Sequence, residues 1–181
     1  MILFLYCSLI REKNNKRFIY KYLNPKFTSN ANAMMSLYAY DKNSLNYACE
    51  KLLDNLKFMT PLIYSNGVNL SKASEKLRNE RSLVINAVLN NSTSLQYACQ
   101  NLRNDFDIVQ LALSKELCKE TFEYASDELR KNRQLIEYAL SISSHNIKHI
   151  HPELYNNKEY IMNYMKKIPD IFEHLNEEMR S

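Results

Sequence analysis

The residues best suited to chemistry are one group of histidines. His145, His149 and His151 lie close together in the sequence, and the step from His145 to His149 could place two imidazoles on one helical face for a metal ion. No cysteine or carboxylate stands at ligand spacing beside them, and Pro152 interrupts a helix soon afterwards. We therefore expect a surface turn at this place and no metal site.

The four cysteines form neither a CxxC pair nor the close spacing of a disulfide framework. Cys49 and Cys99 occupy a small slot in a repeated motif, where they are expected to pack. Cys118, near Lys115 and Lys119, could be a reactive thiol, but no histidine base is close to it in sequence. This usage favours a reducing compartment inside the cell, namely the cytoplasm.

Catalytic signatures are absent from the sequence. It contains no HExxH, GxSxG, Walker or paired-carboxylate pattern. Gly67 is its single glycine, whereas phosphate-binding loops need several glycines. Repetition of the same residues also argues against the one asymmetric constellation that catalysis needs. We predict a protein that is not an enzyme and has no cofactor, no metal and no small-molecule substrate.

The elements that position these residues follow an internal repeat. The segment Leu95–Arg103, LQYACQNLR, has counterparts that start at residues 20, 45, 70, 122, 147 and 172, which gives steps of 25 residues with one of 27. A second pattern, LVxxAV at Leu83–Val88, recurs between the copies and places apolar residues on one face of a helix. Each repeat is therefore predicted to be two short helices. Asparagine is expected to cap the start of the first helix of a repeat, at Asn79, Asn104, Asn132 and Asn157.

A short amphipathic helix cannot bury its apolar face alone, whereas a row of repeats can. The predicted fold is therefore all-α, an α-solenoid of about seven two-helix repeats that winds as a right-handed superhelix. We expect one helical-repeat domain over residues 1–181, with a basic and apolar segment at 1–18, the repeat array at 19–171 and a polar C-terminal cap at 172–181.

Three residue types recur at fixed repeat positions. The tyrosines are expected to pack between repeats, with a nucleic-acid stacking ladder as the alternative. The alanines would let helices approach closely. The arginines suit the negative ends of helices, with phosphate binding as the alternative. These columns are Tyr22, Tyr47, Tyr97 and Tyr124; Ala48, Ala73, Ala98 and Ala125; and Arg78, Arg103 and Arg130.

Positive charge is concentrated at the N-terminus. Residues 1–40 hold six basic residues and one acidic residue, whereas the remainder holds 18 basic and 19 acidic residues. The apolar run Met1–Ile10 is too short to span a bilayer. The segment also resembles a mitochondrial targeting sequence, which makes the mitochondrion the alternative compartment. Its candidate partner-binding residues are Arg11, Lys13, Lys16, Arg17 and Lys21.

The repeats between about residues 79 and 140 resemble a known family. The motifs Leu83–Val88, Leu95–Cys99 and Leu102–Arg103, followed by their next copy, are similar to the domain of unknown function 4116, a tandem helical repeat of protists, giant viruses and some intracellular bacteria. His149 and His174 depart from the pattern, which has tyrosine there. The resemblance implies a helical-repeat fold and no activity.

The function predicted from the sequence is a non-catalytic scaffold for protein–protein interaction, as a subunit of a larger assembly. Two alternatives remain open. One is binding of RNA or DNA through the arginines and the basic N-terminus, within an organellar ribonucleoprotein particle. The other is contact with a membrane surface through residues 1–26.

Overall fold

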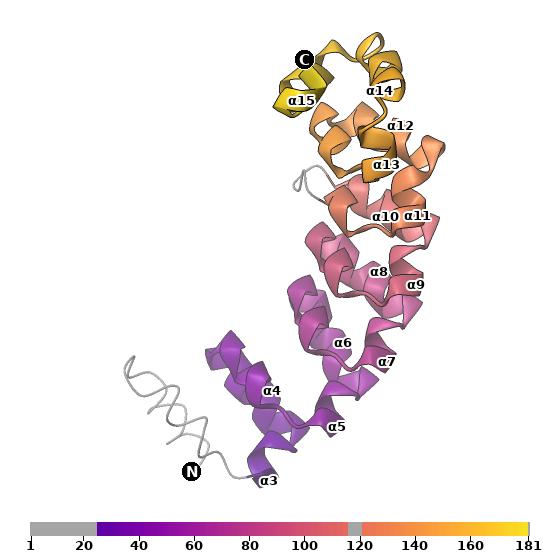
Figure 1. Ribbon diagram of the computed structural model, residues 1–181. Coiled ribbons are helices and arrows are strands. Elements are labelled where there is room, and N and C mark those ends of the chain that lie inside the picture. The colour runs from indigo at the N-terminus through magenta and orange to yellow at the C-terminus, as the bar shows by residue number, and fades with distance from the viewer. Residues whose placement is uncertain (1–24, 116–120, 181) are drawn as a thin grey trace. The chain divides into compact units, whose positions relative to one another are not determined.

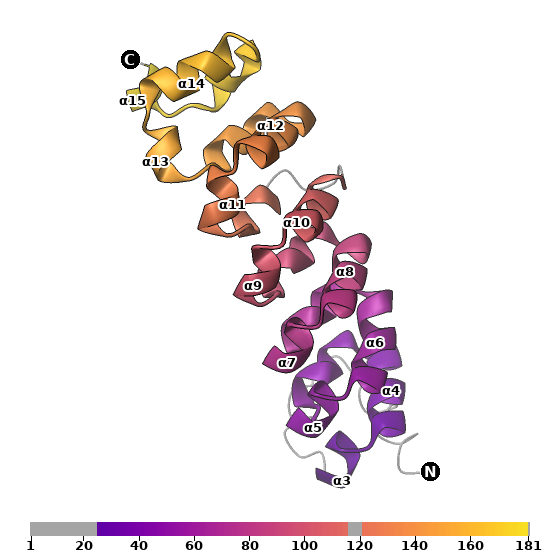
Figure 2. The same cartoon turned by 90° about the vertical axis from the view of Figure 1, so that its right-hand side faces the viewer.

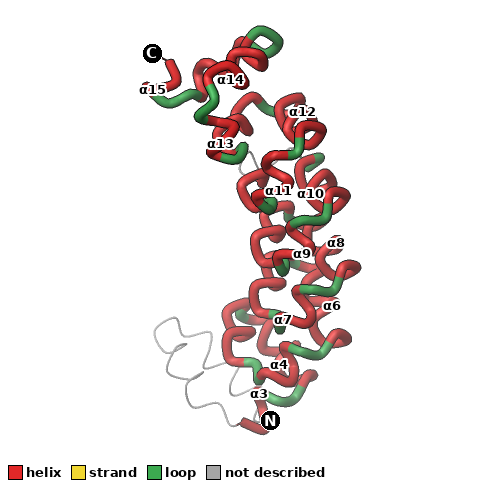
Figure 3. The backbone as a smooth tube through the Cα atoms, turned by 45° about the vertical axis from the view of Figure 1, so that its right-hand side comes forward, coloured by secondary structure: helices red, strands yellow, loops and turns green. Residues whose placement is uncertain are grey.

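The computed structural model describes residues 25–115 and 121–180, and within these residues every regular element is helical (Figures 1 and 3). The predicted all-α fold is confirmed. The described chain forms two compact units, residues 25–62 with 72–77 and residues 63–71 with 78–180. None of the helices in the described ranges combines the length and the apolar character that crossing a bilayer requires.

Each repeat contains a long α-helix, a 3₁₀-helix and a one-turn α-helix, in that order. The long helices are α4 (Ala31–Tyr40), α6 (Leu56–Ser65), α8 (Arg81–Asn90), α10 (Phe106–Leu113), α12 (Arg133–Ile142) and α14 (Lys158–Met165). The 3₁₀-helices are η1 (Lys42–Tyr47), η2 (Gly67–Lys72), η3 (Ser92–Tyr97), η4 (Thr121–Tyr124), η5 (Ser144–His149) and η6 (Pro169–His174). The one-turn helices are α3 (Pro25–Thr28), α5 (Glu50–Leu53), α7 (Glu75–Arg78), α9 (Gln100–Arg103), α11 (Asp127–Lys131), α13 (Pro152–Tyr155) and α15 (Glu177–Arg180).

The second helix of the repeat is divided, which the sequence pattern did not predict. Within Leu95–Arg103, η3 ends at Tyr97, the chain is extended at Ala98 with φ −67° and ψ 151°, and α9 begins at Gln100. The backbone N–H of Cys99 donates to the carbonyl of Arg78 in the preceding repeat, at 3.1 Å. The helix breaks here because this N–H is used between repeats.

The same backbone hydrogen bond recurs at four other repeat junctions, whereas at the last junction the N–H of Asn176 donates to the Tyr155 hydroxyl at 2.9 Å. In the second unit, the N–H of Ser126 donates to Arg103 at 2.9 Å and that of His151 donates to Arg130 at 3.1 Å. In the first unit, Cys49 donates to Thr28 and Ser74 to Leu53, both at 3.0 Å. These four bonds use main-chain atoms only, so the junction geometry does not depend on which side chain occupies the position.

Asparagine or aspartate caps most of the long helices. Its side-chain oxygen accepts the N–H three residues ahead, at 3.0–3.2 Å, in Asn30, Asn55, Asp105, Asn132 and Asn157. The predicted caps Asn132 and Asn157 are confirmed.

The predictions of Asn79 and Asn104 are wrong by one residue, because Glu80 and Asp105 occupy the cap positions. Asn104 instead ends α9 and contacts the next repeat, where its amide nitrogen donates to Glu128 at 2.8 Å and its amide oxygen accepts from the Ser126 hydroxyl.

The core of the second unit lies along one face of its long helices. Helix α10 packs against both α8 and α12, and α9, α11 and α13 follow one another beside them (Figures 1 and 2). The buried residues repeat at equivalent positions, as the sequence periodicity predicted. They are Leu83, Val84, Ala87 and Val88; Ile108, Val109, Ala112 and Leu113; and Leu135, Ile136, Ala139 and Leu140.

Candidate functional site

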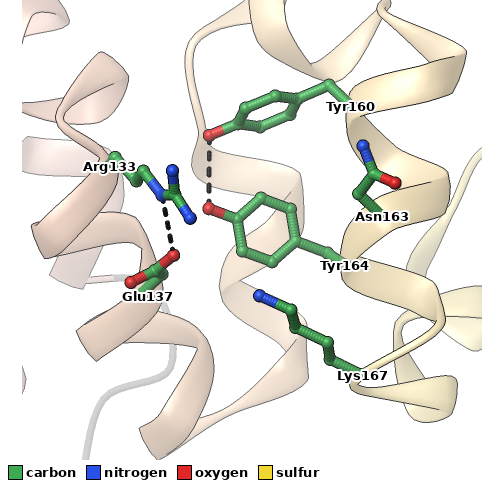
Figure 4. A pocket seen from close by; sticks show the side chains of 6 residues that line it. All are labelled: Arg133, Glu137, Tyr160, Asn163, Tyr164 and Lys167. Atoms are coloured by element: carbon green, nitrogen blue, oxygen red, sulfur yellow. Dashed lines mark hydrogen bonds and ion pairs between the residues drawn. The ribbon is translucent and has the colours of Figure 1, made fainter.

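Helix α14 departs from the repeat at two core positions. Tyr160 stands where α12 has Leu135, and Tyr164 stands where α12 has Ala139. An alanine lets neighbouring helices approach, whereas a tyrosine ring needs space of its own. A pocket of about 200 Å³ lies at this junction, between α12 and α14 in the second unit (Figure 4).

Six side chains line the pocket. Arg133 and Glu137 come from α12, and the others come from α14 and the residues just after it (Figure 4). The hydroxyls of Tyr160 and Tyr164 are 3.4 Å apart, and their rings meet edge to face with centroids 5.2 Å apart. Arg133 Nε donates to Glu137 Oε1 at 2.9 Å. The lining is Arg133, Glu137, Tyr160, Asn163, Tyr164 and Lys167.

The electrostatics make this pocket a set of hydrogen-bond donors. Burial raises the pKa of Tyr164 well above its ordinary value, and its hydrogen bond with Tyr160 adds to the increase. The hydroxyl therefore keeps its proton at physiological pH. The pKa of Arg133 is raised by its hydrogen bond to Glu137, so the guanidinium stays charged. Arg133 and Lys167 bring two positive charges, against one negative charge on Glu137.

Reasoning from the sequence did not identify this pocket. Its signal was visible, because Tyr160 and Tyr164 stand at positions where the other copies of the LVxxAV pattern carry smaller side chains. A departure from a repeat marks an asymmetric site, and here the departure replaces apolar residues with two hydroxyl groups.

The arginine column lies inside the repeat junctions. Arg78, Arg103 and Arg130 are half-buried, and in the described part of the chain their Nε atoms are buried without a hydrogen-bond partner. The guanidinium of Arg130 donates to the His149 carbonyl at 3.4 Å and to Asp127 at 2.6 Å. Of the three, Arg130 thus contacts a carbonyl at a helix end, that of His149 at the end of η5, and the contact expected for Arg78 and Arg103 stays a prediction.

The residues of the other two columns are half-buried or buried. The tyrosines Tyr47, Tyr97 and Tyr124 are half-buried. Ala73, Ala98 and Ala125 are buried, and Ala48 is half-buried. The remaining predicted positions lie outside the described residues; they are Tyr22, Cys118, Arg11, Lys13, Lys16, Arg17 and Lys21.

The structure groups the histidines differently from the sequence. The His145 ring lies 5.5 Å from that of His149 and 5.1 Å from that of His174, measured between centroids. His151 instead caps α13, where its Nδ1 accepts the Glu153 N–H at 3.2 Å. His149 and His174 meet His145 because both occupy the tyrosine position of the repeat. Among the described residues no three His, Cys, Asp or Glu side chains are arranged to hold a metal ion.

Comparison with known proteins identifies the repeats. The family model described as Domain of unknown function (DUF4116) matches residues 55–103, 81–130 and 116–155. No curated protein and no solved structure matches the chain. The three overlapping matches reflect tandem copies, and together they span residues 55–155, more than half of the sequence. The resemblance seen in the central repeats is thus confirmed, and the chain belongs to the DUF4116 family.

Proposed function

We propose that this protein is a non-catalytic helical-repeat scaffold that binds a protein partner, as a subunit of a larger assembly. The observation that carries the proposal is a set of exposed apolar side chains at the C-terminal ends of several long helices. They occupy the ninth or tenth residue of a long helix, close to its C-terminal end.

In the second unit these residues are Tyr64, Leu89 and Ile142, which we call the apolar row. Their exposed fractions are 56%, 45% and 38%. Tyr40 of the first unit is the last residue of α4, as Ile142 is of α12, and is also exposed. Single exposed apolar residues are ordinary on a soluble surface. Recurrence of exposed apolar residues at the same end of several long helices instead favours a surface that contacts another protein.

The backbone beneath the row is held in place. The side chain of Asn90 donates to the carbonyl of Tyr64 at 3.0 Å and accepts from the N–H of Gly67 at 2.7 Å. Leu89 precedes Asn90, so the apolar side chains of two neighbouring repeats are presented by one hydrogen-bonded connection. A surface organised before binding loses less conformational entropy when a partner docks.

Arg130 does not favour the nucleic-acid alternative, because its guanidinium is engaged by Asp127 and by a backbone carbonyl. The membrane alternative rests on residues 1–26, of which only Pro25 and Lys26 are described.

Two matched variants test the scaffold. Leu89→Glu places a charge in the apolar row, and Leu56→Glu makes the same change at the first residue of α6, where the exposed fraction is 46%. Partners should first be isolated from the native source with the full chain, identified, purified and titrated against each variant. We expect Leu89→Glu to weaken binding at least tenfold and Leu56→Glu to leave it unchanged.

Equal binding by both variants would contradict the role of the apolar row. The same titration at low and moderate salt separates the nucleic-acid alternative, because affinity for a polyanion falls steeply as salt rises.

A further inference from the structure

The pocket between α12 and α14 brings together two cationic side chains and two tyrosine hydroxyls. It is smaller than the roughly 300–1,000 Å³ of a site for a drug-sized ligand. Its volume of about 200 Å³ suits a single functional group instead. The chemistry of the lining therefore decides which group fits.

The lining offers donors from both sides. Arg133 reaches the pocket from α12, the hydroxyls of Tyr160 and Tyr164 reach it from α14, and Lys167 reaches it from the segment just after α14 (Figure 4). Guanidinium and ammonium groups carry charge and donate several hydrogen bonds. The two tyrosine hydroxyls share one hydrogen bond, so the pair offers one O–H to a ligand, and a second once that bond opens. Donors that converge from two helices match a group with several charged oxygens pointing in different directions.

We propose that this pocket binds a phosphate group through Arg133, Lys167 and the hydroxyls of Tyr160 and Tyr164. A planar carboxylate has two oxygens and would leave part of this donor set unused, whereas a tetrahedral phosphate presents an oxygen toward each side. Arginine is well suited to phosphate because its planar fork can donate two parallel hydrogen bonds.

Glu137 has two effects on the bound phosphate. Its carboxylate holds the guanidinium of Arg133 through Nε, which leaves the terminal nitrogens for the ligand. The same carboxylate adds a negative charge to the pocket and repels the ligand. Replacing it by glutamine keeps an oxygen that can accept from Arg133 and removes the repulsion.

This inference does not rest on the proposed scaffold. The apolar row belongs to α6, α8 and the last residue of α12, and Leu89→Glu leaves every pocket side chain in place. Failure of one proposal therefore leaves the other standing.

Amide chemical shifts of the ¹⁵N-labelled full chain provide the test. The probes are inorganic phosphate and O-phosphoserine, with acetate as the carboxylate, each titrated at constant ionic strength. Phosphate should shift the amides of residues 160–167 in a saturable manner. Tighter binding of O-phosphoserine would point to a phosphorylated side chain as the source, and tighter binding of inorganic phosphate would point to the free ion.

Variants assign the effect to the pocket. We expect Arg133→Ala and Lys167→Ala each to weaken phosphate binding about tenfold, since each removes a charge-assisted hydrogen bond. Tyr164→Phe should weaken it severalfold, and Glu137→Gln should strengthen it. Arg81→Ala is the matched control, because Arg81 is the first residue of α8 as Arg133 is of α12, and it also pairs with a carboxylate. Arg81→Ala should leave the affinity for phosphate unchanged.

The proposal would be overturned if phosphate left the shifts of residues 160–167 unchanged. Acetate that binds as well as phosphate, or an affinity that Arg133→Ala and Lys167→Ala do not reduce, would overturn it equally.

Discussion

Gly67 and Ala87 approach each other so closely that position 67 has no room for a side chain. A Cβ atom on Gly67 would lie 2.2 Å from the carbonyl oxygen of Ala87 and 2.7 Å from the Ser94 hydroxyl. The φ angle of Gly67 is not positive, so an alanine could adopt its backbone conformation. The glycine is needed because the start of η2 packs directly on the backbone of α8.

Gly67→Ala should therefore destabilise the protein by about 1–3 kcal/mol, the usual cost of forcing an extra carbon into a packed site. The expected readout is a lower urea midpoint for unfolding, followed by far-ultraviolet circular dichroism. Lys72→Ala, at the exposed end of the same 3₁₀-helix, is the control and should leave the midpoint nearly unchanged. A variant as stable as the parent would show that η2 can move away from α8.

Glu80 is the exception among the caps of the long helices, because its side chain makes no capping hydrogen bond. Glu80→Asn should stabilise the protein by about 0.5–1 kcal/mol, since asparagine can accept the free N–H groups of the first turn of α8. Asn132→Ala provides the opposite change at an occupied cap and should destabilise by about 1 kcal/mol. Thermal unfolding of both variants checks the pair, and a loss of stability in Glu80→Asn would contradict the prediction.

The ion pair of Asp105 and Arg81 predicts a dependence on acid. Burial acts to raise the pKa of Asp105, but hydrogen bonds from Arg81 at 2.9 Å and from the N–H of Ile108 outweigh it, so the pKa lies below its ordinary value. A carboxyl with a lowered pKa in the folded state stabilises fully above its unfolded pKa, and it loses this contribution as pH falls from about 4 through the folded pKa.

Asp105→Asn keeps the cap and removes the charge. We expect its stability to be lower than that of the parent at neutral pH, with a difference that shrinks as the solution is acidified below about pH 4. Arg81→Gln removes the same ion pair by changing the other partner. Its stability should also be lower than that of the parent at neutral pH, with a difference that shrinks below about pH 4. Urea midpoints measured from acidic to neutral pH give the answer, and a constant difference across that range would refute it.

Arg130 should stabilise its junction through packing and through its bond to the His149 carbonyl. Its side chain is 21% exposed, compared with 77% for Arg133. Arg130→Ala should cost about 1–3 kcal/mol, Arg130→Met should recover part of the loss by keeping the stem, and Arg133→Ala should cost less than about 0.5 kcal/mol. Urea denaturation ranks the three variants by their unfolding midpoints. Equal midpoints for Arg130→Ala and Arg133→Ala would show that Arg130 contributes no more to stability than an exposed arginine.

Much of the fold could be predicted because the repeat makes every core position visible several times. The apolar pattern placed Leu83, Ile108 and Leu135 on buried faces, where they lie. The break at Ala98 could not be predicted in the same way. Leu95 and Ala98 are three residues apart, a spacing that fits both an α-helix and a 3₁₀-helix. The hydrogen bond from the Cys99 N–H to the Arg78 carbonyl, which the sequence does not reveal, ends the 3₁₀-helix at this place.

The candidate site was harder to predict for a related reason. Comparison of the repeat copies emphasises the residues that they share. Tyr160 and Tyr164 form the pocket because they differ from their counterparts Leu135 and Ala139. The contact of His145 with His174 required knowledge of which repeats are neighbours in space, since the two residues are 29 positions apart in the sequence.

The main-chain bonds at the junctions join residues only 21 to 23 positions apart, even where the step between copies lengthens from 25 to 27 residues. Such short sequence separations keep loop-closure costs small, which favours rapid folding. They also leave each junction independent of the total number of copies. After duplication or deletion of one copy, the same bond would therefore form between the repeats that become neighbours. The number of repeats could change during evolution without any change in the junctions.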